Sequence, residues 1–212
     1  MPPQDAGERV HAAASLATHL KEGEVDQAYA VKRLVRGLCS SRGGARQGFA
    51  AGLTLILHET SEESLALSDI LQVVLKETAT TAGMRGAEER DLLLGRLFGL
   101  GACARSGRSL SLDTMSELTD RTLDLFEKRK WMHEACITVF RDILVNHDDL
   151  GVEEALAKMA KLIGPDPLQY RADELALALV VEEKLRYLAA SDEEAAGRLF
   201  KLFPKSLRPP KK

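Results

Sequence analysis

A run of cations near the N-terminus is the clearest chemical pattern in the sequence. Five basic residues and no acidic residue lie between Asp26 and Glu59: Lys32, Arg33, Arg36, Arg42 and Arg46. Because guanidinium and ammonium groups bind phosphate and carboxylate oxygens, the run predicts a surface that contacts a nucleic-acid backbone or an acidic protein. Arginine also donates to backbone carbonyls, so these side chains could instead support the turn at Gly43 and Gly44.

Two smaller basic groups follow, first Arg96, Arg105 and Arg108 and then Lys128, Arg129 and Lys130. The net charge of -3 and the isoelectric point near 6.0 exclude a uniformly basic nucleic-acid coat, so any such binding requires a local patch. A solvated helix face explains any one group by itself. Stacked helix pairs could place several groups on one surface, so Arg96 and Arg105 join the first five residues as candidate partner contacts.

The sequence contains no pattern that predicts catalysis, a metal site or a cofactor. Residues 99–104, GLGACA, match the spacing of a dinucleotide-binding fingerprint, but no strand precedes them and they fall inside a helical run. Gly95, Gly99 and Gly101 are instead expected to let a neighbouring helix approach closely. His133 and Glu134 lack the second histidine of a zinc motif, and an exposed helix position explains both. We therefore expect no enzyme, cofactor, metal ion or small-molecule substrate.

Amphipathic helices must position the basic residues. Apolar side chains at Val31, Leu34, Val35 and Leu38 repeat with helical spacing and leave the neighbouring cations on the solvent side. Similar stripes recur between glycine and proline breakers, and the predicted helices are 8–20, 24–40, 45–59, 64–81, 87–106, 112–128, 130–146, 150–163, 171–190 and 192–202. Aromatic residues make up only 5% of the chain, which is also typical of close-packed helices and nearly excludes an all-β fold.

The predicted fold is all-α, a right-handed α-solenoid of HEAT/armadillo-like helix pairs, because pairs of helices recur about every 40 residues. A compact helical bundle is the alternative, since it satisfies the same pattern. Residues 1–203 are expected to form a single helical-repeat domain, and residues 204–212 a basic, proline-rich tail that is disordered.

Several apolar residues are expected in the core. The stretch 174–183 has no polar stripe, so its helix is predicted to be buried on most sides. Phe98 and Trp131 are expected to pack between helices, with a surface anchor for a partner as the alternative role of Trp131. Three unpaired cysteines are expected as small core residues in a reducing compartment: Cys39, Cys103 and Cys136. No segment predicts export or a membrane span.

Three segments share their order and spacing with one protein family. They are YAVKRLVRGLCSSRGGARQGF at 29–49, ERDLLLGRLFGLGACARSG at 89–107 and KWMHE at 130–134. Over residues 24–145 the chain resembles the N-terminal region of the Myb-binding protein 1A family, also called the DNA polymerase phi family. Met132 and His133 stand where the family has leucine and arginine, which reduces the basic contribution there.

The resemblance implies a helical protein of the nucleus and nucleolus that acts in rRNA gene transcription, ribosome biogenesis and transcriptional co-regulation. The implied partners are DNA (rDNA) or pre-ribosomal RNA and nucleolar or transcription-factor proteins. A protein-only adaptor is the alternative, and a DNA polymerase, as the family name suggests, would need a magnesium-binding acidic cluster. Because family members are several times longer, the chain is expected to be a fragment, a shortened gene model or a divergent short relative.

Overall fold

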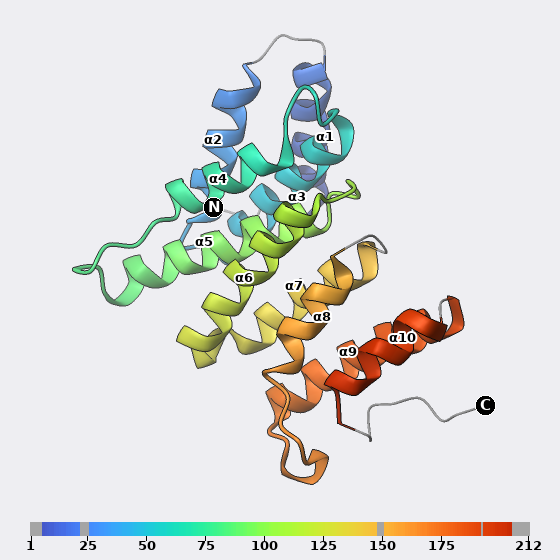
Figure 1. The fold of residues 1–212 in the computed structure, drawn as a ribbon. Coiled ribbons are helices and arrows are strands. Elements are labelled where there is room, and N and C mark those ends of the chain that lie inside the picture. The colour runs from blue at the N-terminus through green and yellow to red at the C-terminus, as the bar shows by residue number, and fades with distance from the viewer. Residues whose placement is uncertain (1–5, 22–25, 148–150, 192, 205–212) are drawn as a thin grey trace. The chain divides into compact units, whose positions relative to one another are not determined.

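Helices make up all the regular structure that the computed structural model describes, which covers residues 6–21, 26–147, 151–191 and 193–204 (Figure 1). The all-α prediction is therefore confirmed, and the predicted helices agree with the observed ones apart from a few residues at their ends. The chain divides into two compact units, Met1–Arg108 and Ser109–Lys212. Residues 205–212, which include nearly all of the predicted tail, lie outside the described part of the chain.

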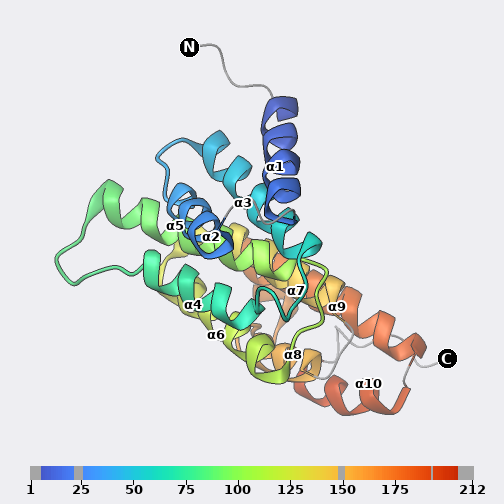
Figure 2. The same ribbon diagram turned by 90° about the horizontal axis from the view of Figure 1, so that it is seen from above.

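Five helices form the first unit: α1 (Ala6–Lys21), α2 (Gln27–Leu38), α3 (Gly43–Glu59), α4 (Leu67–Glu77) and α5 (Gly86–Ala104). The carboxylate of Asp26 caps α2 by accepting a hydrogen bond from the Tyr29 amide at 3.2 Å. The predicted stripe of α2 is buried, and α2 lies against α3, α4 and α5 (Figure 2). Burial of this stripe fixes the rotation of α2 about its own axis, and so decides which of its side chains reach solvent.

Glycines allow α5 to approach two neighbouring segments closely. A Cβ atom added at Gly95 would lie 2.5 Å from Cys39 Sγ, and one at Gly99 would lie 2.6 Å from Val74 Cγ1. The prediction of a close approach is thus confirmed at these two positions. At Gly101 the three atoms nearest an added Cβ all belong to the Arg105 side chain, the closest at 3.0 Å, so this glycine makes room for a side chain at the end of its own helix.

The second unit contains α6 (Leu112–Lys128), α7 (His133–Asn146), α8 (Val152–Ala160), α9 (Ala172–Ser191) and α10 (Glu193–Leu199), with short 3-10 turns at Lys130–Met132, Pro167–Gln169 and Phe200–Leu202. The helices α6 and α7 lie against each other, as do α7 and α9, and α9 and α10. The core side chains of α7 include Cys136, Phe140 and Ile143, which belong to one predicted stripe.

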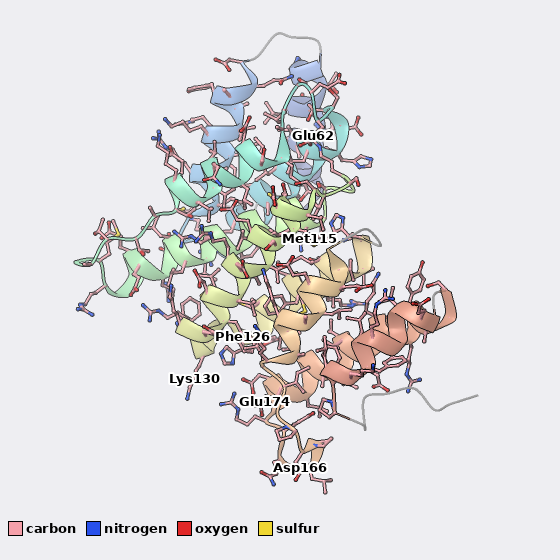
Figure 3. All side chains as sticks on the ribbon, viewed as in Figure 1. Glu62, Met115, Phe126, Lys130, Asp166 and Glu174 are labelled. Carbon is pink, nitrogen blue, oxygen red and sulfur yellow. The ribbon has the colours of Figure 1, made fainter. Side chains whose placement is uncertain are left out.

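His133 connects three of these helices, and its predicted exposed position is wrong. Its ring stacks on Phe126 with 3.9 Å between centroids, its Nε2 lies 2.8 Å from the Phe126 carbonyl, and its Nδ1 lies 2.5 Å from Asp173 Oδ2. Phe126 near the end of α6 and the start of α9 at Glu174 mark this place in Figure 3. Burial by itself raises the pKa of Asp173, but hydrogen bonding to His133 and the charge of Arg171 bring it below its ordinary value.

Two core predictions are corrected. Trp131 is 52% exposed, because it lies in the short 3-10 turn between α6 and α7 while its neighbour Met132 takes the buried position. On α9, Leu175 and Leu179 are exposed and only one face, with Leu177 and Val181, is buried. A helix without a polar stripe is therefore not buried on all sides in this unit.

The three cysteines are free thiols, and two of them, Cys103 and Cys136, are core residues as predicted. Burial raises the pKa of the Cys103 and Cys136 thiols to about 12, which keeps both protonated. Cys39 is half-buried against Gly95, and burial raises its pKa as well. Within the described ranges, no helix combines the length and apolar character needed to cross a membrane.

Candidate nucleic-acid interface

Four predicted cations lie on the surface of the first unit. Lys32, Arg33 and Arg36 are exposed on the side of α2 opposite its buried stripe, as the helical spacing predicted, and Arg42 is exposed at the residue that precedes α3. We call these four residues the basic face. Positive side chains on successive turns of one helix provide the electrostatic footprint that a phosphate backbone or an acidic protein requires.

A carboxylate from another helix shares part of the basic face. Glu77, the last residue of α4, accepts a hydrogen bond from Arg36 Nε at 2.6 Å and lies 3.6 Å from Lys32 Nζ. The hydrogen bond from Arg36 is the main reason that the pKa of Glu77 is below its usual value. Arg36 nevertheless keeps 57% of its side chain exposed. Among the described residues, no ion pair joins Arg33 or Arg42 to a carboxylate.

Arg46, a predicted contact residue, lies inside the first unit instead of on its surface. Its side chain is 13% exposed, its Nη1 lies 3.5 Å from Asp91 Oδ1 on α5, and the same nitrogen donates to the Ser40 carbonyl. Those two contacts hold the start of α3 and the turn before it against α5. The structural role that the sequence left open for these arginines therefore applies to Arg46.

The other predicted arginines have separate positions. Arg96 donates from Nη2 to the Thr78 carbonyl at 2.9 Å and from Nε to Thr78 Oγ1 at 3.2 Å, so it caps the end of α4. Arg108 donates to the carbonyls of Leu57, Thr60 and Leu65 and holds the connection between α3 and α4. Arg105 is exposed at the residue that follows α5.

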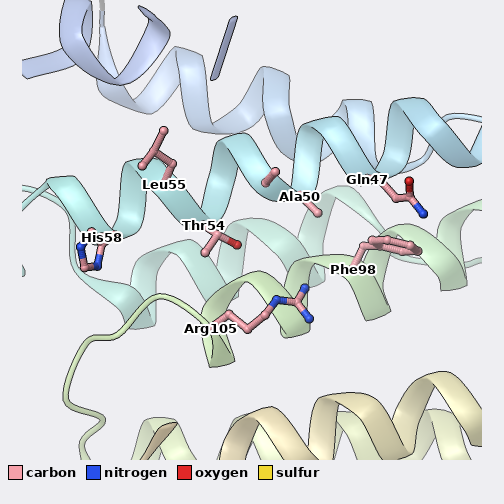
Figure 4. Close-up of a pocket in the computed structure, with 8 residues that line it drawn as sticks. Gln47, Ala50, Thr54, Leu55, His58, Phe98 and Arg105 are labelled. Atoms are coloured by element: carbon pink, nitrogen blue, oxygen red, sulfur yellow. The ribbon is translucent and has the colours of Figure 1, made fainter. Parts of the chain in front are cut away.

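A groove of about 450 Å³ lies between α3 and α5 (Figure 4). It is lined by Gln47, Ala50, Ala51, Thr54, Leu55, His58, Phe98 and Arg105. Phe98 is half-buried in its wall, so the prediction that Phe98 packs between helices holds for only part of the ring. The lining carries one guanidinium and one imidazole and no carboxylate, and it has the size of a small-ligand pocket.

Sequence reasoning missed the acidic partners of the cations and all of the groove except Arg105. Glu77 and Asp91 lie far from the basic run along the chain, so no local pattern connects them to it. The spacing of Phe98 and Arg105, seven residues apart on one helix, is the signal that could have suggested a shared surface. Across the described ranges, His, Cys, Asp and Glu side chains do not gather in threes as a metal site requires.

Comparison with known proteins places the chain in a family. A family model described as DNA polymerase phi matches residues 29–200. The chain is 31% identical over 139 residues to the rDNA transcriptional regulator pol5 of Schizosaccharomyces pombe, a match that covers 64% of this chain and 14% of the relative. It is 30% identical over 165 residues to the rDNA transcriptional regulator POL5 of Saccharomyces cerevisiae, covering 63% of this chain and 16% of the relative.

The matched region is a small part of these relatives, since the chain spans about a sixth of their length or less. No solved structure matches the chain. The family model covers most of the sequence and includes the basic face, α5 and Trp131. The chain therefore belongs to the DNA polymerase phi family.

Proposed function

We propose that the chain is a non-catalytic helical scaffold that acts in rRNA gene transcription and ribosome biogenesis, in the nucleus and nucleolus. The names of both relatives as regulators of rDNA transcription support this role and give no support to polymerase activity. Its partners in this proposal are rDNA or pre-ribosomal RNA, together with nucleolar and transcription-factor proteins.

The observation that carries the nucleic-acid part of the proposal is the basic face. Two of its four cations, Lys32 and Arg36, pair with one carboxylate, Glu77, so the face keeps a net positive charge in a chain whose total charge is -3. Such a face attracts phosphates with little dependence on base sequence, because it contacts only the backbone. Arg33 and Arg42, which have no ion pair with the described carboxylates, are the main phosphate contacts in this arrangement.

Binding of a mixed-sequence DNA duplex at several salt concentrations tests this function. Each phosphate contact contributes a slope of about -0.9 to the plot of log affinity against log salt, so Arg33 and Arg42 together predict about -2. The double variant Arg33→Glu, Arg42→Glu should abolish binding and leave the melting temperature nearly unchanged, because both side chains are exposed. Arg85→Glu, Lys161→Glu is the matched control, with the same change of charge at two other exposed positions.

An equally strong interaction of the double variant with DNA would show that the basic face does not bind phosphate. The remaining candidate is then a protein-only adaptor, which Trp131 favours because it is 52% exposed and tryptophan is enriched in the hot spots of protein interfaces. Primer extension by the purified chain tests the enzymatic alternative, and the proposal predicts no extension.

We also propose that residues 1–203 form one right-handed HEAT/armadillo-like solenoid. Neighbouring helices pair within each unit, α2 with α3 and α4 with α5 in the first, and α6 with α7 in the second, as helix repeats do. Small-angle scattering provides the test, because a compact chain of this length has a radius of gyration of about 17 Å and a solenoid a larger one.

A further inference from the structure

We infer that the groove between α3 and α5 binds one unpaired nucleotide of a single-stranded nucleic acid, with its base on Phe98 and its phosphate on Arg105. The inference rests on the proposed nucleic-acid role and adds a second site to it. The basic face contacts only the charged phosphates of the nucleic-acid backbone, whereas this groove combines a positive charge with an aromatic surface.

The first argument is the placement of the aromatic ring. Phe98 forms part of a groove wall in the first unit and remains partly exposed, and Gln47 and Ala50 of α3 lie across from it, with Thr54 further along the groove toward Arg105 (Figure 4). A partly exposed ring that faces one small side chain, Ala50, and one flexible side chain, Gln47, leaves space for a flat group on its face. Stacking on an aromatic ring is the contact that proteins use for unpaired bases.

The second argument is the position of the guanidinium. Residues 98 and 105 lie on the same side of α5, about 10 Å apart along the helix axis. The Arg105 side chain extends back over Gly101, with its Nη2 3.0 Å from the place where a Cβ of residue 101 would lie. The charge is therefore level with residue 101, about 4.5 Å along the axis from Phe98. This separation is comparable to the span of one nucleotide from base to phosphate.

The third argument is the polarity of the lining. The groove contains Arg105 and His58 but no carboxylate, so a phosphate meets no repulsive charge from its walls. Thr54 and Gln47 of α3 supply a hydroxyl and an amide that can hydrogen-bond to a base edge. In a duplex the base faces are covered by their neighbours, so the groove selects single strands over duplex.

Four fluorescent probes of about 12 nucleotides test the inference: oligothymidylate, oligouridylate, an abasic DNA strand of the same length, and a duplex. The full chain should bind at least one of the two base-bearing strands about fivefold or more tightly than the abasic strand, since stacking of one base on one aromatic ring accounts for this difference. Comparing the affinities for oligothymidylate and oligouridylate shows whether the groove prefers a nucleotide of DNA or of RNA.

Three variants identify the residues. Phe98→Leu keeps an apolar side chain in the wall and should remove the preference for the base-bearing strand. Gly101→Ala should push the Arg105 guanidinium aside and weaken binding of single strands about threefold or more without lowering the melting temperature, because the atoms nearest the added methyl belong to the far end of the flexible Arg105 side chain. Arg85→Gln is the control for Arg105→Gln, because Arg85 lies at the opposite end of α5, about 30 Å away.

A strand that carries 5-iodouridine gives a readout that packing alone does not affect, because it crosslinks to a stacked aromatic ring. The crosslink should map to the peptide that contains Phe98 and should be lost in Phe98→Leu. Equal affinity for abasic and base-bearing strands, or a base preference that survives in Phe98→Leu, would overturn the inference. Binding of a helical peptide of Glu, Ala and Leu that depends on Arg105, with no effect of the groove variants on oligonucleotides, would also overturn it and assign the groove to an acidic protein.

The duplex probe separates this inference from the proposed function. One outcome is that the duplex binds in a salt-dependent way that the double variant Arg33→Glu, Arg42→Glu abolishes, while base-bearing and abasic single strands bind equally. That result supports the basic face and rejects only the groove. A chain that binds none of the four probes rejects both sites.

Discussion

At the scale of single residues, the arginines of the first unit have different roles: some hold the backbone of the chain, and others are exposed to a partner. The Arg108 side chain is 9% exposed and satisfies three carbonyls of one connection, so it holds the backbone. Arg33 is exposed on α2 and has no ion pair with a described carboxylate, so its charge remains available to a partner. Replacing a buried arginine by glutamate should therefore destabilise the fold, whereas the same replacement of an exposed arginine should not.

Arg46→Glu should lower the free energy of unfolding by about 2–3 kcal/mol, whereas Arg33→Glu should change it by less than about 0.5 kcal/mol. Asp91 keeps 16% of its side chain exposed, and the substitution places a second carboxylate against it and removes the donor to Ser40. Urea denaturation measures both values. Equal stability of the two variants would mean that Arg46 does not hold α3 against α5.

The exposure of Trp131 makes the only tryptophan a direct probe of its own environment. Its fluorescence should resemble that of tryptophan in water, and acrylamide should quench it efficiently, because 52% of the side chain is exposed. Trp131→Ala should destabilise the chain by about 1 kcal/mol or less, far below the 3–5 kcal/mol of a core aromatic. A blue-shifted emission that resists quenching would show that the ring is covered in solution.

At the scale of elements, the glycines of α5 differ in what an added methyl group meets. Gly99→Ala drives a Cβ into Val74 and should cost about 2 kcal/mol, although alanine is the better helix former by about 1 kcal/mol. In Gly101→Ala the atoms nearest the added methyl are the far end of the flexible Arg105 side chain, so the stability of this variant should be unchanged or higher. Thermal melting of the two variants compares them within one helix, and a Gly99→Ala variant as stable as Gly101→Ala would contradict the close contact between α4 and α5.

The contact between His133 of α7 and Asp173 of α9 predicts that the stability of the fold depends on pH. Hydrogen bonding to His133 and the charge of Arg171 outweigh burial and lower the pKa of Asp173, so this carboxylate stabilises the fold above its unfolded pKa of about 3.9. That contribution is lost as the pH falls through the lowered pKa of the folded state. Asp173→Asn should cost about 1–2 kcal/mol near neutral pH, and its stability should approach that of the parent below about pH 4. If the difference in stability between Asp173→Asn and the parent stayed constant across this pH range, Asp173 would not be ionised in its contact with His133.

Helix positions follow from the sequence because their causes are local. Glycine and proline breakers and the stripe of α2 place its ends within a few residues of Gln27–Leu38, and the exposure of Lys32, Arg33 and Arg36 follows from the same spacing. The partners Glu77 and Asp91 do not follow, because they reach the cations only through packing of α2 and α3 against α4 and α5. The exposure of Trp131 depends likewise on a short turn in which one of two adjacent apolar residues faces the core.

At the scale of the whole molecule, net charge and local charge have opposite signs. The chain carries 32 acidic and 29 basic side chains, so at long range it repels a polyanion. Within a Debye length of about 8 Å at physiological salt, however, nearby groups dominate, and the ion pairs of the described residues bring one carboxylate, Glu77, to the four cations of the basic face. Low salt should therefore strengthen the attraction of the basic face and also the repulsion by the rest of the chain.

Glu77→Gln tests this balance without adding any new cation. The substitution removes the one carboxylate that holds Arg36 and Lys32, at 2.6 Å and 3.6 Å, and keeps an oxygen that can accept from Arg36. Both cations then become available to phosphates, so duplex affinity should rise about threefold or more, and the salt dependence should steepen by about -0.9 for each newly engaged cation. Glu127→Gln, at an exposed position of the second unit, makes the same change in net charge and should leave the slope unaltered. Equal gains in the two variants would mean that DNA responds to the total charge of the chain and that α2 offers it no specific surface.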